Sequence, residues 1–364
     1  MSRALLAGAV SAIIAVAVLL PAHVSRGQPL WPGARFTGGD RDRAIQRGMR
    51  FLYSIACEPG HFEEWGHDLL GMFATIAVTS SNRELRRMAW SMGHERALAW
   101  RSLHPHPPPG ADAEEVFELM AGSDAAERLG VSDGGMRREL RAAAARFTAI
   151  DYYGFDPAAE SPPADIPNEC GQCSIQNARG ARRCARCGQA LTFRSRYGVW
   201  LDALIGTYTA DRYGVTLGAH YLDVLHWLPA MRPYPQAGQA GHYEATYAIT
   251  HVIYTLNDYS ANRLSPDCLP DEFDFLHTNL PASIDRHNPE AVGEYLDTLG
   301  AFGLTLADST VRSGVEYLLS AQNPDGSWGD RASPDAYRRY HPTWTAIDGL
   351  REYRWGKMLP CVEP

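Results

Sequence analysis

Apolar residues recur at helical spacing along most of the chain. In segment 41–56, Ile45, Met49, Leu52 and Ile55 are three or four positions apart, which places them on one face of an α-helix. Alternating patterns typical of strands are scarce, so we predict an all-helical fold. The same periodicity predicts further helices at 67–80, 82–103, 111–122, 136–154, 197–211, 219–231, 243–259, 290–302, 310–321 and 343–353.

The N-terminus has a different pattern. An apolar run without charge extends from Ala4 to Leu20. At about 1.5 Å per residue it is barely long enough for a hydrocarbon core of about 30 Å. Residues 1–27 are therefore interpreted as a signal peptide or a membrane anchor, with an ordinary buried helix as the third alternative. We expect an exported or anchored protein, membrane association through residues 4–20, and a linker at 28–40.

Composition narrows the function classes. The chain has 364 residues, 45% of them hydrophobic, so a large core can form without disulfides. A net charge of −8 gives no sign of a general nucleic-acid binder. Nine tryptophans and seventeen tyrosines suit rings packed between helices or around a cavity. No phosphate loop, serine nucleophile elbow or dinucleotide fingerprint is visible.

Four cysteines have the spacing of a metal site. Cys170, Cys173, Cys184 and Cys187 form the pattern C-x2-C-x10-C-x2-C, and two such pairs can hold one tetrahedral ion. Segment 165–192 resembles a zinc ribbon, which implies structural zinc with no open position. Two disulfides are the alternative, because exported chains meet oxidising conditions. The arginines of this segment indicate either a solvated surface or a site for an acidic partner.

A second motif lies near the C-terminus, in the stretch "SGVEYLLSAQNPDGSW". A glutamine follows a predicted helix, and a glycine then permits a tight turn before a tryptophan. We expect the glutamine side chain to bond carbonyl groups at the helix end, and the tryptophan ring to pack on the glutamine and on the next helix. A chance arrangement is the alternative. The motif positions are Gly314, Tyr317, Leu318, Gln322, Gly326 and Trp328.

This stretch resembles the QW motif of squalene and hopene cyclases, which also occurs in the β subunits of protein prenyltransferases. A weaker copy has Gly48 and Trp65 in place, but Ala56 stands where glutamine should be. The resemblance implies an α/α toroid, with inner helices around a cavity and outer helices around them. The toroid would comprise residues 41–160 and 195–364, interrupted by the ribbon. In such a ring the N-termini of the inner helices share one rim.

Three histidines begin apolar helices and are candidates for that rim. They are His67, His242 and His341, and the last two are each followed by threonine four residues later. The stretch "YRRYHPTWTAIDGL" also resembles the prenyltransferase β-subunit segment whose histidine binds catalytic zinc. Three histidines at one rim would leave a metal position open to water or substrate. Capped, hydrogen-bonded helix starts are the alternative.

Other residues could complete such a site. His251 lies two and a half turns after His242, and therefore on another face. In the prenyltransferases an aspartate and a cysteine two residues apart supply the remaining ligands. Here Asp267 and Cys268 are adjacent, which departs from that pattern. Cys57, Cys268 and Cys361 are three leftover cysteines, which cannot all pair with one another.

Two functions remain open. The first is a membrane-associated or exported enzyme, of prenyltransferase-like or terpene-cyclase-like fold, that takes an apolar or extended substrate in a central cavity with a possible second metal. The second is a non-catalytic toroid that binds a polypeptide or lipid, with the ribbon as a docking module. Cyclisation of a triterpene would need a desolvated acid. The acidic run "PDEFDF" lacks the cyclase pattern, and we expect it to be solvated.

Overall fold

The computed structural model describes residues 36–132, 134–164, 170, 172–173, 175, 177–178, 180–191 and 193–361. The proposed signal peptide or anchor at 1–27, and most of the linker, lie outside these residues. Within them, no helix combines the length and apolar character needed to cross a membrane.

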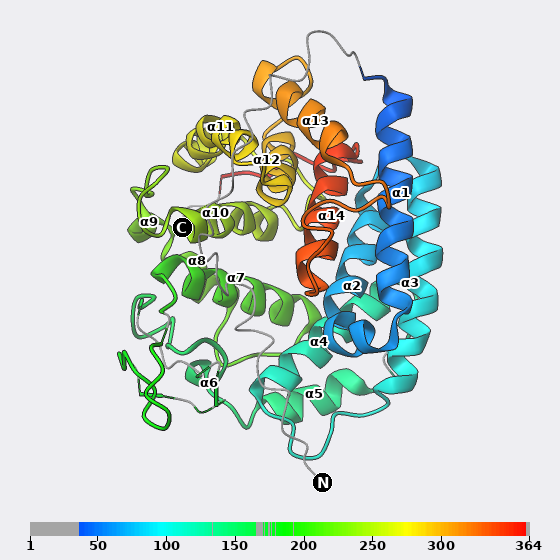
Figure 1. Cartoon of the computed structure of the whole chain (residues 1–364). Helices are drawn as coiled ribbons and strands as arrows, with labels where there is room; N and C mark the ends of the chain where they lie inside the picture. Colours follow the sequence, from blue (N-terminus) through cyan, green and yellow to red (C-terminus); the bar gives the residue numbers. More distant parts are fainter. Residues whose placement is uncertain are drawn as a thin grey trace.

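The described chain is all-helical, as the periodicity predicts, and contains isolated β-bridges but no strand. Figure 1 shows the arrangement of the helices. The helices are α1 (Gly38–Cys57), α2 (Pro59–Thr79), α3 (Arg83–Leu103), α4 (Ala113–Arg128), α5 (Met136–Ala144), α6 (Ala149–Tyr153), α7 (Arg196–Tyr213), α8 (Tyr221–Leu225), α9 (Leu228–Met231), α10 (His242–Leu256), α11 (Pro270–Asp285), α12 (Pro289–Ala301), α13 (Ser309–Ala321) and α14 (Tyr337–Leu350).

Polar residues fix where several of these helices begin. Thr37 and Asp40 form a capping box at α1, and Asp112 and Glu115 form another at α4. The side chain of Asp308 accepts hydrogen bonds from two backbone N–H groups at the start of α13. Each cap satisfies N–H groups that have no partner inside the helix, so these short polar signals set the helix boundaries.

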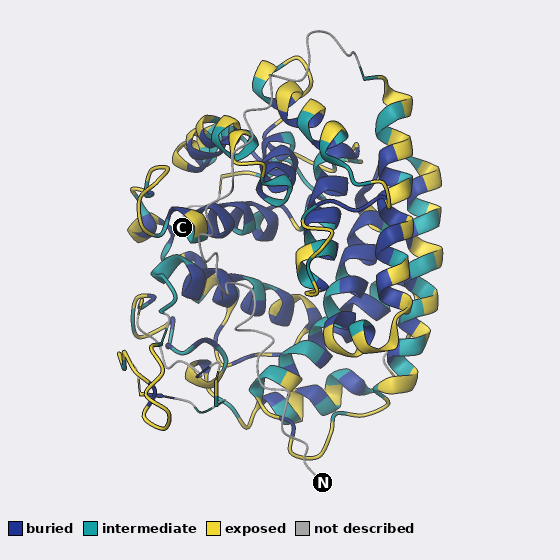
Figure 2. Cartoon of the chain, in the orientation of Figure 1, coloured by how far each residue is buried: buried dark blue, intermediate teal, exposed yellow. Residues whose placement is uncertain are grey.

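Helices α2, α4, α7, α10, α12 and α14 form the inner part of the molecule. Each packs on neighbours from this set, and α1, α3, α5, α11 and α13 pack on its outer side (Figure 1). Figure 2 shows that α10, α12 and α14 are buried over most of their surface, whereas α1 and α3 expose one face. Between α2 and α14, the Tyr340 hydroxyl donates to Asp68 at 2.8 Å, and Trp65 packs on Tyr337 and Tyr340.

The glutamine–tryptophan motif joins α13 to α1 and α14, with the two side chains in exchanged roles. We expected Gln322 to satisfy the helix-end carbonyls, but the indole of Trp328 does so, because its Nε1 donates to Leu318 O at 2.8 Å. Gln322 Nε2 instead donates to Ala44 O in α1 at 2.8 Å and to Gly326 O at 2.9 Å. Trp328 is fully buried.

Two glycines make this junction possible. Gly326 has a φ of +94°, and a Cβ there would lie 2.7 Å from Arg47 O. Gly48, from the weaker copy of the motif, faces Trp328 so closely that a Cβ would lie 2.9 Å from the ring. A side chain at either position would push α1 away from the turn, because neither contact leaves room for another carbon.

Candidate functional site

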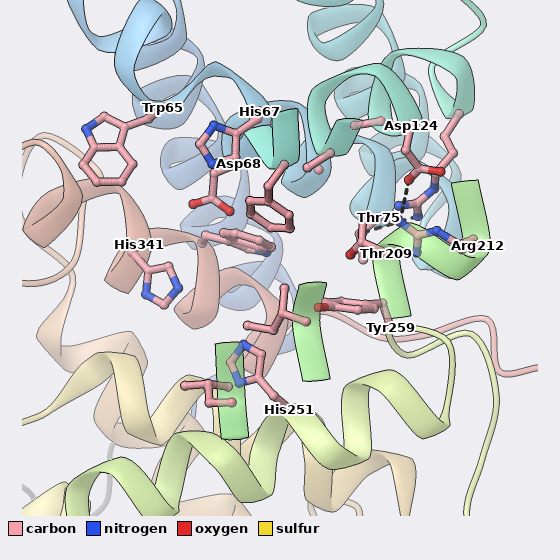
Figure 3. Close-up of a pocket in the computed structure, with 18 of the residues that line it drawn as sticks. Trp65, His67, Asp68, Thr75, Asp124, Thr209, Arg212, His251, Tyr259 and His341 are labelled. Carbon is pink, nitrogen blue, oxygen red and sulfur yellow. Dashed lines mark hydrogen bonds and ion pairs between the residues drawn. The ribbon is translucent and has the colours of Figure 1, made fainter. Parts of the chain in front are cut away.

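One pocket is lined by all six inner helices. It has a volume of about 160 Å³, and Tyr259, in the loop after α10, completes its wall. Figure 3 shows Trp65, His67, Asp68 and His341 toward one end of the pocket, where α2 and α14 meet. The pocket therefore combines aromatic walls with ionisable groups, a composition typical of binding and catalytic sites.

Two glutamates and a histidine form a candidate metal site, of which Glu290 and His341 line the pocket and Glu294 is buried beside them. Glu290 and Glu294 lie one turn apart on α12, and His341 lies on the adjacent α14. One ligand atom from each residue lies within 4.8 Å of the other two. His341 Nδ1 is 3.3 Å from Glu290 Oε1, and the Thr250 hydroxyl donates to Glu294 Oε2 at 2.5 Å. Two carboxylates and an imidazole can bind a divalent metal ion and leave positions open.

Burial and neighbouring charges perturb all three groups. Burial opposes the charged form of His341, but the charge of Glu290 and their hydrogen bond raise the pKa of His341 to about 9. Burial also opposes ionisation of Glu290, yet His341 lowers its pKa below the usual value. Burial raises the pKa of Glu294 to about 8. At neutral pH the cluster thus holds two protons that a bound cation would displace.

His251 faces the same pocket from α10 (Figure 3). Burial, and then the charge of His341, lower its pKa to about 4, although a hydrogen bond to Tyr247 opposes the shift. Its Nδ1 lies 2.8 Å from Tyr247 O, so Nδ1–H donates and Nε2 keeps its lone pair. Burial also lowers the pKa of His67. Both imidazoles are therefore neutral at physiological pH, and a free ring nitrogen can accept a hydrogen bond or bind a metal ion.

Not all the histidines expected at one rim meet there. The pocket brings together His67, His251 and His341, and it includes His251 but not His242, as expected for two residues on different faces of one helix. His242 does not line it, because its Nδ1 lies 2.9 Å from Pro235 O and its ring packs on Phe275. This histidine is a buried, hydrogen-bonded helix start, which is the alternative stated above.

The aspartate–cysteine pair is also remote from the pocket. Cys268 forms a disulfide with Cys361, so its thiol is not free to bind a metal ion. Asp267 is exposed in the short turn η2 (Pro266–Cys268). The expected solvation of the following acidic run is wrong for Glu272, which is fully buried and paired with Arg232.

Several residues in or beside the pocket escaped the sequence analysis. The pair Glu290 and Glu294 carried a signal, because two glutamates one turn apart in an apolar helix face the same side. Asp124 and Arg128 had a similar spacing on α4. Arg212 had no signal, since only the tertiary fold brings α7 beside α4.

The four ribbon cysteines form a separate cluster that could bind a metal ion such as zinc. All four are free thiols. Cys170 Sγ lies 3.5 Å from Cys187 Sγ, and Cys173 Sγ lies 3.5 Å from Cys184 Sγ. Thiolates about 2.3 Å from a tetrahedral ion would be about 3.8 Å apart, whereas a disulfide requires about 2.0 Å. The backbone N–H of Arg186 points at Cys184 Sγ at 3.4 Å, as in a metal knuckle.

Comparison with known proteins gives no relative from which function can be transferred: no family model matches the chain, and no curated protein does.

Proposed function

We propose that the chain is a metal-assisted hydrolase built on an α/α toroid. The toroid is supported by six inner helices that line one pocket and by an outer set packed around them. The resemblance to QW-repeat proteins led us to the same fold. The proposal that it is an enzyme depends on one observation: Glu290 and His341 line that pocket, Glu294 is buried beside them, and one ligand atom from each lies within 4.8 Å of the others.

Zinc or a similar divalent ion held by these three residues would supply a water activated at neutral pH. The chain's own groups then have separate roles. Nε2 of His251 would accept a hydrogen bond from a water or substrate hydroxyl and so orient it. The Thr250 hydroxyl holds Glu294 in place by its 2.5 Å hydrogen bond. The rings of Trp65, Tyr337 and Trp344 exclude solvent and hold the substrate.

The charged lining refines the expected substrate. A purely apolar molecule would offer no hydrogen bond to His251 Nε2 or to the remaining lone pairs of Asp68 and Glu290 in a partly desolvated pocket, which is unfavourable. A substrate with both polar groups and an apolar face fits the lining better.

We propose that the four ribbon cysteines bind a structural zinc ion. We also propose that the protein is exported or membrane-anchored. The Cys268–Cys361 disulfide supports an oxidising compartment. Four neighbouring thiols would oxidise there unless a metal ion bound them. The coexistence of this disulfide with four free thiols therefore supports both proposals.

Metal content tests the enzyme proposal. Elemental analysis of protein purified without chelator should give about two metal equivalents per chain. Glu294→Gln and His341→Ala should each remove one equivalent, and Ser at the four ribbon cysteines should remove the other. His242→Ala is the matched control, because that histidine lies outside the pocket, and it should retain both. One equivalent in the wild type, lost with the ribbon cysteines, would contradict the enzyme proposal and favour a non-catalytic scaffold.

A further inference from the structure

The end of the pocket away from His341 carries two guanidinium groups. Arg128 from α4 and Arg212 from α7 both line the cavity. Arg212 forms an ion pair with Asp124. Arg128 Nη2 donates to the Thr75 hydroxyl at 3.4 Å, and no carboxylate of the described residues lies within ion-pair distance of it. Figure 3 shows Arg212, Asp124 and Thr75 at the opposite end of the pocket from Trp65.

The charges at this end do not cancel. Two guanidinium groups face one buried carboxylate, that of Asp124, which leaves one net positive charge. The carboxylate of Asp258 also interacts electrostatically with Arg128. It is exposed to solvent and accepts a hydrogen bond from Tyr208, so it does not neutralise Arg128. Burial, followed by the charge of Arg212, lowers the pKa of Arg128. An unbalanced cation in a partly dry pocket favours a bound anion.

Three hydroxyl-bearing side chains lie on the same side of the pocket as the arginines. Thr75, Thr209 and Tyr259 all line the pocket at this end (Figure 3). The backbone that carries Tyr259 is unusual, because Asp258, Tyr259 and Ser260 are consecutive non-glycine residues with φ of 58°, 48° and 65°. Left-handed conformation costs roughly 1–2 kcal/mol at each such residue. Such strain persists where surrounding contacts enforce it, and it clusters at functional sites.

The contacts that enforce this turn are specific. Ser260 N–H donates to Asn257 Oδ1 at 2.8 Å, and its hydroxyl donates to Asp297 Oδ1 at 2.8 Å. Tyr259 N–H donates to Tyr254 O at 2.7 Å. The turn therefore holds Tyr259 at the pocket wall beside the two arginines.

We propose that this end of the pocket binds a carboxylate group of the substrate, with Arg128 as its principal partner. One net positive charge matches a carboxylate, whereas a phosphate monoester carries close to two negative charges. A guanidinium also matches the two oxygens of a carboxylate in geometry. The proposal rests on the hydrolase function above, since it places the carboxylate at Arg128 and the bond to be cleaved beside Glu290 and His341.

Three monosubstituted benzenes test it: benzoate, its neutral isostere benzamide, and phenyl phosphate. Titration calorimetry on the full metal-loaded chain should show benzoate binding at least about tenfold more tightly than benzamide and more tightly than phenyl phosphate. Arg128→Met should weaken benzoate about tenfold or more without changing benzamide. Asp124→Asn, which adds one net positive charge, should shift the preference toward phenyl phosphate. Arg312→Met, at an exposed arginine outside the pocket, is the matched control and should change nothing.

Equal affinity for benzoate and benzamide would overturn the proposal. So would unchanged benzoate binding in folded Arg128→Met, tighter binding of phenyl phosphate by the wild type, or no binding of millimolar benzoate. Circular dichroism establishes that each variant is folded. Metal content separates this proposal from the hydrolase function: two equivalents without benzoate selectivity refute only the carboxylate site, and selectivity with metal in the ribbon alone refutes only the catalytic metal.

Discussion

Replacing Trp328 with alanine tests the junction that joins α13 to α1 and α14. The side chain is fully buried, and truncation of a large aromatic in a core costs about 3–5 kcal/mol. The change also leaves Leu318 O, a buried carbonyl, without the indole donor at 2.8 Å, which costs about 1–3 kcal/mol. Since the terms overlap, we expect a loss of roughly 4–6 kcal/mol in the free energy of unfolding. That is a large share of the roughly 5–15 kcal/mol typical of a domain.

Two matched variants separate these terms. Trp328→Phe keeps most of the ring against Gly48 but loses the N–H donor, so it should cost about 1–3 kcal/mol. Trp90→Ala removes a tryptophan that is 48% exposed and should cost under about 1 kcal/mol. Urea denaturation of metal-loaded protein, followed by far-UV circular dichroism, measures all three. A loss below about 1 kcal/mol for Trp328→Ala would refute the junction.

Three further predictions concern backbone conformation and buried charge. Gly326→Ala should destabilise the protein by more than about 1 kcal/mol, measured by urea denaturation, because φ is +94° and Cβ would lie 2.7 Å from a backbone oxygen. Burial and neighbouring acids raise the pKa of Glu118 from 4.5 to about 8. Between these values the unfolded chain loses the proton that the folded protein keeps, so the free energy of unfolding falls as pH rises. Glu118→Gln should therefore gain stability over the wild type between pH 5 and 8, by at most about 5 kcal/mol. Arg351→Met should cost about 3–5 kcal/mol in the same assay, because it leaves the Asp348 carboxylate, 2.6 Å away, without its cation.

Each of these has its own control. Gly110 has a φ of +84° with open space around it, so Gly110→Ala should cost less than Gly326→Ala. A stability gap between Glu118→Gln and the wild type that is the same at pH 5 and 8 would disprove the ionisation argument. Arg43→Met removes a side chain that is 70% exposed in its ion pair and should cost under about 1 kcal/mol. Equal losses for Arg43→Met and Arg351→Met would show that burial does not decide the cost.

Long helices were predictable where apolar periodicity and caps agree. The predicted segment 82–103 nearly coincides with α3 (Arg83–Leu103), which Asn82 caps. The predicted helix at 219–231 is instead two short helices, α8 and α9, because Pro229 can begin a helix but cannot continue one. Helix α11 was missed, since two prolines and many polar residues hide its apolar face. Local patterns therefore predicted helices better than breaks.

The site was predictable only in part. His341 and His251 were candidates from sequence, and both line the pocket. Glu290, at the start of a predicted helix, became significant only once α12 and α14 were seen side by side. The environment of Arg128 depends on residues from α2, α4 and α7, so no local pattern specifies it. Periodicity indicates which face of a helix is buried, but not which other helix that face meets.

The two candidate metal-binding clusters become complete at different stages of synthesis of the chain. All four ribbon thiols have been synthesised once residue 187 has been added, and short local contacts link them. The pocket, by contrast, needs α14 to dock between α1 and α12, so its wall is complete only when nearly the whole chain is present. A ribosome-bound fragment ending before α14 would thus contain all four thiols of the ribbon, whereas its pocket would lack the wall that α14 supplies.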